Sequence, residues 1–154
     1  MAQGDVVVFD QFLENVFDSG IHDFGASPNV IKCAIVDNTI TPSATTADPC
    51  WGAGGTTNLA ANEQTGGNFS AGGNTCATAS ATLNAGTLEI DFGDPATWAQ
   101  NASNPTTCYW GIIYDDTTTN KNCIGYVDLG GVFDATTGDL TITWGAPFAT
   151  VDQA

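Results

Sequence analysis

The chain has 154 residues, of which 2 are basic and 17 acidic, so its formal net charge is −15. Binding to nucleic acid or to an anionic membrane depends on Lys and Arg, and with only Lys32 and Lys121 present both functions are excluded. Charged residues make up 12% of the chain, about half the usual share, so uncharged small residues must cover the surface, and this composition favours strands, turns and long loops over helices.

One amphipathic helix is predicted near the N-terminus. The apolar residues that recur there at helical spacing are Phe9, Phe12, Leu13, Val16 and Phe17. Asp10 is placed to cap the first turn, and Gly20 is placed to end the helix. We expect the phenylalanine stripe of this helix to lie on a sheet.

Short strands are predicted for much of the remaining chain. Segments that are rich in β-branched residues, or that alternate apolar and polar residues, are 30–36, 75–82, 87–92 and 140–144. Residues 37–74 hold prolines and many Gly, Thr and Asn residues, and we interpret them as a long loop insertion. Trp98 is expected to plug the core from the loop 94–105, and residues 146–154 are expected to be a tail.

Residues 108–128 predict the β-hairpin around which the fold is organised. Two runs rich in aromatic and β-branched residues flank a polar block at 115–122. Alternation places on one face of the first strand Cys108, Trp110, Ile112 and Tyr114. Neither face carries many polar residues, so this strand should be central and covered on both sides, with Trp110 and Tyr114 as core anchors. A turn is expected at 130–131.

These elements together predict a single, mainly β domain over residues 1–154. The expected architecture is an antiparallel β-sandwich or a barrel-like fold, with one short N-terminal helix and long Gly/Thr-rich loops. The N-terminal residues do not form a signal peptide and no run is long enough for a transmembrane helix, so we expect synthesis in a cytoplasm.

Five cysteines without metal-binding spacing are expected to be small buried hydrophobes. They are Cys33, Cys50, Cys76, Cys108 and Cys123. One late disulfide, formed after release into an oxidising medium, is the alternative.

Residues that could carry chemistry are few, and no catalytic pattern joins them. His22, the single histidine, precedes Asp23, but no nucleophile motif accompanies it, and we expect it to have a local role in a turn. A pair of carboxylates for glycoside hydrolysis arises by chance among 17 acids. Calcium could be held by Asp115, Asp116 and Asn120, or by Asp91 and Asp94. Neither spacing matches an EF-hand loop, so we predict no metal site. Since no catalytic pattern joins the candidate residues, we also predict no enzyme and no cofactor.

Six blocks of sequence carry a further signal. They are DPCWGAGGTTNL at 48–59, GGNFSAGG at 66–73, WAQNASNP at 98–105, YWGIIYDDT at 109–117, IGYVDLGG at 124–131 and GDLTITW at 138–144. In this order they resemble a widespread group of small tailed-bacteriophage virion proteins, which are associated with head decoration, or cement, roles. The resemblance implies a β-rich fold, no enzymatic activity, and a homotrimer bound to the major capsid protein on the outer capsid. It places no functional residues.

Two other functions stay open. One is a component of the phage tail or of a fibre, since the resemblance distinguishes a virion protein better than it distinguishes head from tail. The other is a carbohydrate-binding module in which an exposed Trp51 or Tyr126 stacks on sugar rings.

The charge of the chain restricts where copies of it could touch. Three chains, each with a formal net charge of −15, carry −45 together and repel one another, so the surface through which subunits touch must contain few acidic residues. Residues 51–74 contain one acid, Glu63, and the apolar residues Trp51, Leu59 and Phe69, which we take as the candidate contact with a neighbouring subunit or the capsid. The alternative is that Trp51 and Phe69 pin this loop onto the core of their own chain.

Overall fold

The structure is a computed structural model that describes residues 3–18, 20–25, 29–77 and 79–152. It contains one α-helix, α1 (Asp10–Phe17), and one 3-10 turn, η1 (Leu59–Asn62). The strands are β1 (Val6–Val8), β2 (Ile31–Val36), β3 (Pro49–Cys50), β4 (Thr57–Asn58), β5 (Asn74–Thr75), β6 (Ser80–Asn84), β7 (Thr87–Asp91), β8 (Cys108–Asp115), β9 (Cys123–Phe133) and β10 (Ala149–Asp152). The mainly β, sandwich-like fold with one short N-terminal helix is therefore confirmed.

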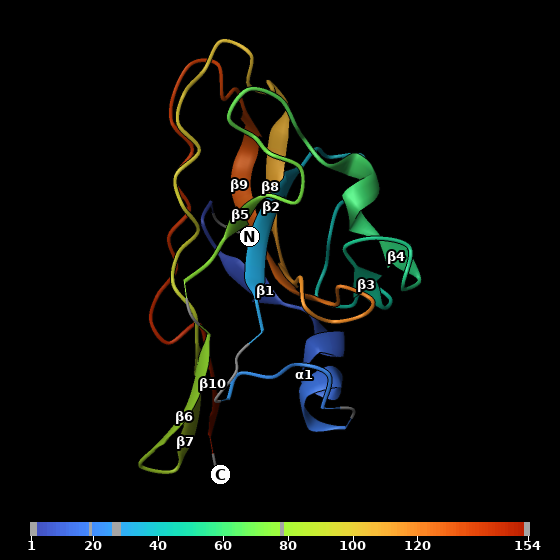
Figure 1. Ribbon diagram of the computed structural model, residues 1–154, viewed down its shortest axis with the longest axis vertical. Helices are drawn as coiled ribbons and strands as arrows, with labels where there is room; N and C mark the ends of the chain where they lie inside the picture. The colour runs from blue at the N-terminus through green and yellow to red at the C-terminus, as the bar shows by residue number, and fades with distance from the viewer. Residues whose placement is uncertain (1–2, 19, 26–28, 78, 153–154) are drawn as a thin grey trace.

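The main sheet has five strands in the order β1-β9-β8-β2-β5, and every neighbouring pair is antiparallel. The predicted hairpin is confirmed as β8 and β9, and β8 is the central strand of this sheet. A second sheet, in the order β10-β7-β6, extends away from the end of the main sheet (Figure 1). The third sheet is the short parallel pair of β3 and β4.

The main sheet is covered on both faces, as its hairpin sequence predicts. Ile112 and Tyr114 of β8 belong to one buried apolar cluster, and Ile113 belongs to another. Cys108 does not share a face with Trp110 as alternation predicts, but lies in the same buried cluster as Ile113. The cause is a shift in strand register between Cys108 and Trp110. Tyr114 is a core anchor at 1% exposure, whereas Trp110 is only half-buried.

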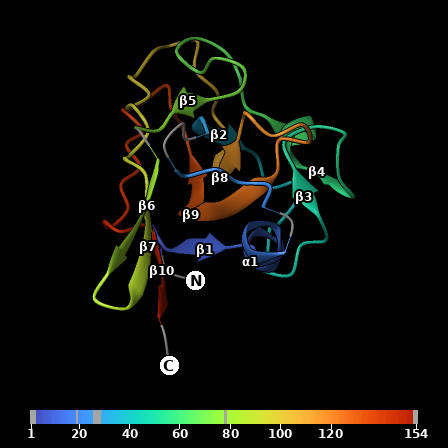
Figure 2. The same ribbon diagram turned by 60° about the horizontal axis from the view of Figure 1, so that its bottom comes forward.

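The helix forms where its periodicity predicts, but it buries less than expected. Phe9, which makes no cap bond through its side chain, is the N-cap residue, and Asp10 is already in the first turn. Phe12 is fully buried, whereas Leu13 and Phe17 are 46% and 60% exposed. Figure 2 shows α1 following directly on β1 at the margin of the main sheet, so little sheet surface is available to cover the rest of its stripe.

The C-terminal part of the chain differs from the prediction. Residues 140–144 form no strand, because their backbone is paired only at Leu140, which exchanges two 2.9 Å hydrogen bonds with Trp98. Farther along, the amide of Trp144 donates to a carboxylate oxygen of Asp94 at 2.9 Å, so a side chain takes the place of a ladder carbonyl. The predicted tail instead supplies β10, which pairs with β7.

Three smaller boundaries also differ. The predicted strand at 75–82 is divided between β5 and β6, which belong to different sheets. Gly130 and Gly131 are not a turn but lie inside β9, where both have positive φ. Residues 37–74 hold β3, β4, η1 and the start of β5 between irregular segments.

Candidate functional site

The three candidate contact residues occupy two different cores. Trp51 stacks on Tyr114 with ring centroids 4.9 Å apart and planes 14° apart, and Leu59 lies in the same cluster. Phe69 stacks on Trp98 in the other cluster, at 5.8 Å and 26°. The structure therefore brings Trp51 and Leu59 together and places Phe69 apart from them.

A tight turn carries Phe69 into its core. Gly66 and Phe69 exchange backbone hydrogen bonds of 3.0 and 2.9 Å, and Gly67 between them has positive φ. The side chain of Asn104 accepts from the amide of Asn68 at 2.8 Å and donates to the carbonyl oxygens of Ala99 and Ala135. Asn104 is buried with these partners, so it fastens the Phe69 turn to the loop that holds Trp98.

Burial decides what these three side chains can touch. Trp51 is 6% exposed, Leu59 1% and Phe69 3%, all within a single chain. This is the arrangement expected if Trp51 and Phe69 pin the loop onto its own core. A contact between this loop and a neighbouring subunit stays a prediction, and it would rest on the exposed residues of the loop.

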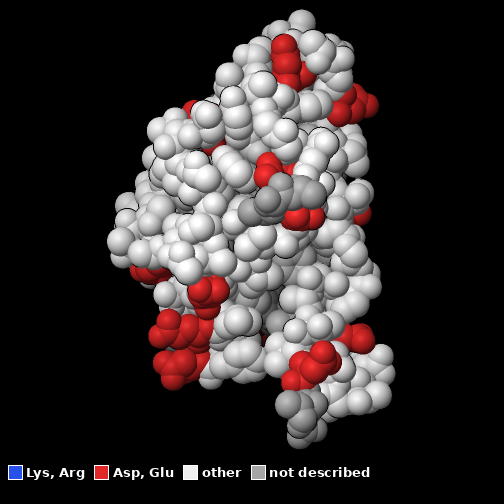
Figure 3. Space-filling model, turned by 180° about the vertical axis from the view of Figure 1, so that it is seen from behind, with Lys and Arg blue, Asp and Glu red and all other residues white. Residues whose placement is uncertain are grey.

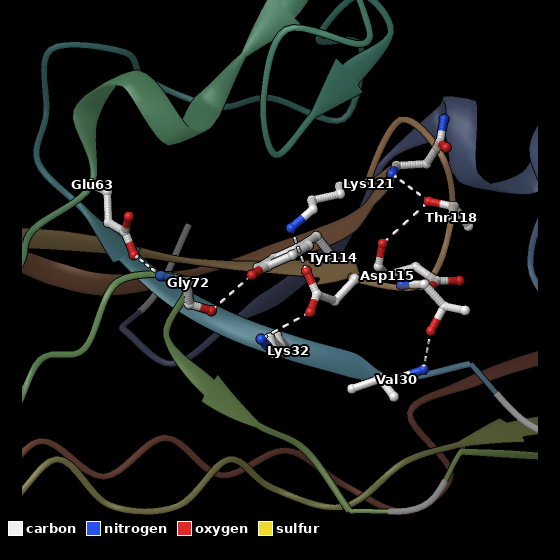
Figure 4. Close-up of polar contacts among 11 residues, drawn as sticks. Val30, Lys32, Glu63, Gly72, Tyr114, Asp115, Thr118 and Lys121 are labelled. Atoms are coloured by element: carbon white, nitrogen blue, oxygen red, sulfur yellow. Dashed lines mark hydrogen bonds and ion pairs between the residues drawn. The ribbon is translucent and has the colours of Figure 1, made fainter.

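The two basic side chains of the protein converge on one carboxylate. Lys32 of β2 lies 2.9 Å from one oxygen of Asp116, and Lys121 lies 2.7 Å from the other (Figure 4). Burial alone raises the pKa of Asp116, but the hydrogen bonds and charges of Lys121 and Lys32 outweigh burial and hold the pKa below its usual value. Since the sequence contains no other Lys or Arg, this contact uses all of its permanent positive charge.

A second set of polar contacts ties the long loop to the central strand beside this carboxylate. The hydroxyl of Tyr114 donates to the carbonyl oxygen of Gly72 at 2.8 Å, and the amide of Gly72 donates to Glu63 at 2.5 Å. Burial raises the pKa of Glu63, although the bond from Gly72 and the charge of Lys32 oppose it. Burial also raises the pKa of the Tyr114 hydroxyl, so it stays a donor at neutral pH. The group of residues therefore fixes the loop in place.

His22 has a long-range partner, not the local turn role predicted for it. Its Nδ1 atom lies 2.9 Å from Asp115, and both side chains are fully buried. The amide nitrogen of the Asn29 side chain donates to the same Asp115 oxygen at 2.6 Å, and the backbone amide of Thr117 donates to the other at 3.0 Å. Among the described residues nothing hydrogen-bonds to Nε2 of His22, so the pair lacks the hydroxyl or thiol of a nucleophilic triad. The sequence gives no signal for this contact, whose partners are 93 residues apart.

Three of the five candidate calcium ligands make other contacts. Asp115 holds His22, Asp116 holds both lysines, and Asp94 accepts the amide of Trp144. Within the described ranges, no group of three or more His, Cys, Asp and Glu side chains is arranged to hold a metal ion.

The five cysteines are free and buried, which confirms their expected role as small hydrophobes. Burial raises the pKa of Cys50 and Cys108 to about 11 and that of Cys76 to about 12, and it raises the pKa of Cys33 and Cys123 well above the ordinary value. At neutral pH these thiols are protonated, and they are poor nucleophiles in that form.

The surface offers few aromatic faces and much negative charge. Trp51 and Tyr126, the rings considered for sugar stacking, are 6% and 2% exposed, so neither is free to stack on a ligand. Acidic side chains lie in several separate groups on the rear face, and no basic residue is visible there (Figure 3).

The chain matches no protein-family model, no curated protein and no solved structure. In the part of the chain that the structure describes, no helix has the length and apolar character needed to cross a membrane.

Proposed function

We propose that the chain is a non-enzymatic structural protein of a bacteriophage virion that decorates and stabilises the outer capsid. Its partners are other copies of itself, in a homotrimer, and the major capsid protein. It is made in the cytoplasm of the host and resides on the virion.

The observation that supports this proposal most is that the sequence blocks resembling virion proteins contact one another in pairs. Trp51 of block 48–59 stacks on Tyr114 of block 109–117. Phe69 of block 66–73 stacks on Trp98 of block 98–105, and the side chain of Asn104 links the same two blocks by accepting a hydrogen bond from the amide of Asn68. The blocks on which the resemblance rests therefore supply residues to both buried clusters of this chain.

The chemistry of the polar groups agrees with a protein that works by contact. The charged clusters at Asp116 and Asp115 join strands and loops of the chain itself, and burial keeps the five thiols protonated. The long loop is fastened to the body of the chain at Trp51, Gly72 and Phe69, which suits a surface used for attachment to a shell.

The direct test is binding to heads assembled without the protein. Purified protein is mixed with such heads and the mixture is sedimented, and we expect the protein to pellet with the heads up to a saturating copy number. Protein that stays in the supernatant at every concentration contradicts the proposal. Immunogold labelling of intact particles separates the head from the tail, since a tail or fibre component would label only the tail.

A further inference from the structure

The second sheet has one wholly apolar face built from two rows of side chains. In the register of its three strands, Ala81, Ile90 and Ala149 lie opposite one another and form an inner row. Leu83, Leu88 and Val151 are opposite one another in the same way, and they form an outer row on the same face, two residues farther along each strand.

The chain buries Ile90 and half-buries Ala149, Leu88 and Val151, whereas Ala81 and Leu83 at the edge of this face are exposed. Ile90 is 2% exposed and belongs to the larger core, against which Ala149 also packs. Leu83 is 73% exposed, the highest value among the exposed large hydrophobic residues, and no member of the outer row belongs to either core of the described residues. Figure 1 shows why: the hairpin of β6 and β7 and the strand β10 extend beyond the body of the protein.

The opposite face of the same sheet is polar and acidic. Glu89 lies between Thr82 and Thr150 across the strands, and Asp91 and Asp152 are on this face as well. The six residues of the apolar face include no charged residue. One thin sheet thus separates a charged surface from an uncharged apolar one.

We propose that the outer row, Leu83, Leu88 and Val151, is the surface on which a second copy of this chain docks. The inference rests on the proposed function in that it names the self-contact of the decorating protein. Two copies of a chain of charge −15 repel one another, and with two lysines against 17 acids, cross-subunit ion pairs can offset little of the repulsion. The contact must therefore exclude acids, as this face does.

The row also matches itself. When a second row is laid against it across a two-fold axis, Leu88 meets Leu88 and Leu83 meets Val151, so every apolar side chain finds an apolar partner. In the proposed homotrimer, three copies of this face would meet about a three-fold axis, and each copy would pack against two neighbours.

The size of the face sets the strength of the association. Two strands of five residues and one of four, about 4.8 Å apart, present a patch of about 220 Å², part of which the chain itself covers. A stable interface buries about 800 Å² on each partner. We therefore expect reversible, concentration-dependent association in solution, which the repeated sites of a capsid would strengthen by raising the effective concentration.

The test compares two uncharged substitutions on opposite faces of one strand, Leu83→Gln and Thr82→Gln. Both side chains are exposed, so circular dichroism should show both variants folded. Sedimentation velocity across a concentration series gives the apparent dissociation constant. We expect it to rise about tenfold or more in Leu83→Gln, because the contact loses a buried leucine, and to stay within about twofold of the original protein in Thr82→Gln. A third variant, Leu83→Met, should keep the association.

Three outcomes overturn the inference: an unmodified protein that is monomeric at every concentration, a Leu83→Gln variant that associates normally, and equal losses in the two Gln variants. Sedimentation with capsids separates its failure from that of the proposed function. A monomeric protein that pellets with heads refutes the docking face alone. A protein that associates through Leu83 but never binds heads refutes only the capsid role and supports the docking face.

Discussion

Replacing Trp51 with alanine should destabilise the single folded chain. The indole is 6% exposed and lies nearly parallel to the ring of Tyr114, 4.9 Å away. Truncating a buried tryptophan to alanine lowers the free energy of unfolding by about 3–5 kcal/mol, of which the aromatic pair accounts for about 0.5–1.5 kcal/mol. In a chain of this length each kcal/mol changes Tm by about 2–4 °C, so we expect a decrease of about 6–20 °C.

Denaturant unfolding at two protein concentrations shows where the lost contact lies. Dissociation depends on concentration, whereas packing within a chain does not. We expect the same loss of unfolding free energy for Trp51→Ala at both concentrations. Trp51→Phe is the matched control, because it keeps a ring against Tyr114 and should recover much of the loss.

The result that refutes this reasoning is a small loss with a change of assembly. If Trp51→Ala loses less than about 0.5 kcal/mol, the range of an ordinary surface substitution, while its oligomer dissociates, the ring acts between subunits and not in its own core.

Two further predictions concern the polar network and the thiols. Lys32→Met keeps the aliphatic stem and should cost less than about 1 kcal/mol at neutral pH, since the Lys32 and Asp116 side chains are 25% and 22% exposed. The pKa of Asp116 is lower in the folded protein, so the contribution of Asp116 to the free energy of unfolding is present above its unfolded pKa of about 3.9 and is lost as the pH falls through the folded pKa. In urea unfolding, the difference in stability between the original protein and Lys32→Met should therefore shrink in acid. A difference that stays constant with pH would contradict the ion pair. Burial raises the pKa of all five thiols, so a thiol reagent at pH 8 should label them only when the protein unfolds. The free energy of unfolding should fall as the pH rises above about 8.5, because thiols ionise there in the unfolded chain but stay protonated in the folded protein. Rapid labelling of the folded protein would contradict the burial of the thiols.

The parts of the fold that the sequence predicts are those fixed by local patterns. The hairpin of β8 and β9 needs only two apolar runs and a polar loop between them, and all three lie within one short segment. Trp98 is identifiable as a core residue because a tryptophan in a polar loop of a folded domain is seldom left in water.

Strand pairing depends on the partner, and this is where the local pattern fails. Residues 140–144 alternate well, but their neighbour at Trp98 offers one bridge and then the side chain of Asp94. The less regular residues of β10 form a strand because an edge of β7 is open to them. The exposed Phe17 has a similar cause, since periodicity shows which face of a helix is apolar but not how much sheet lies beneath it.

The polar contacts vary in how far the sequence could have predicted them. Lys121 and Asp116 are five residues apart in one hairpin loop, and Lys32 reaches them because β2 pairs with β8, so a correct strand order would have predicted the cluster. His22 and Asp115 meet only because the segment after α1 packs against the end of β8, and no spacing or motif signals that contact.

Because the protein has so few positive charges, only a surface that is poor in acids can contact a second copy of the chain. The chain sets two lysines against 17 acids, so over a distance of about 8 Å at physiological salt one copy repels another. Most orientations of two copies bring carboxylates together and are disfavoured. An approach through Leu83 keeps Glu89 and Asp91 on the far side of the sheet, so apolar contact can outweigh the repulsion there. Repulsion would thus give a small apolar face the specificity that its area alone does not supply.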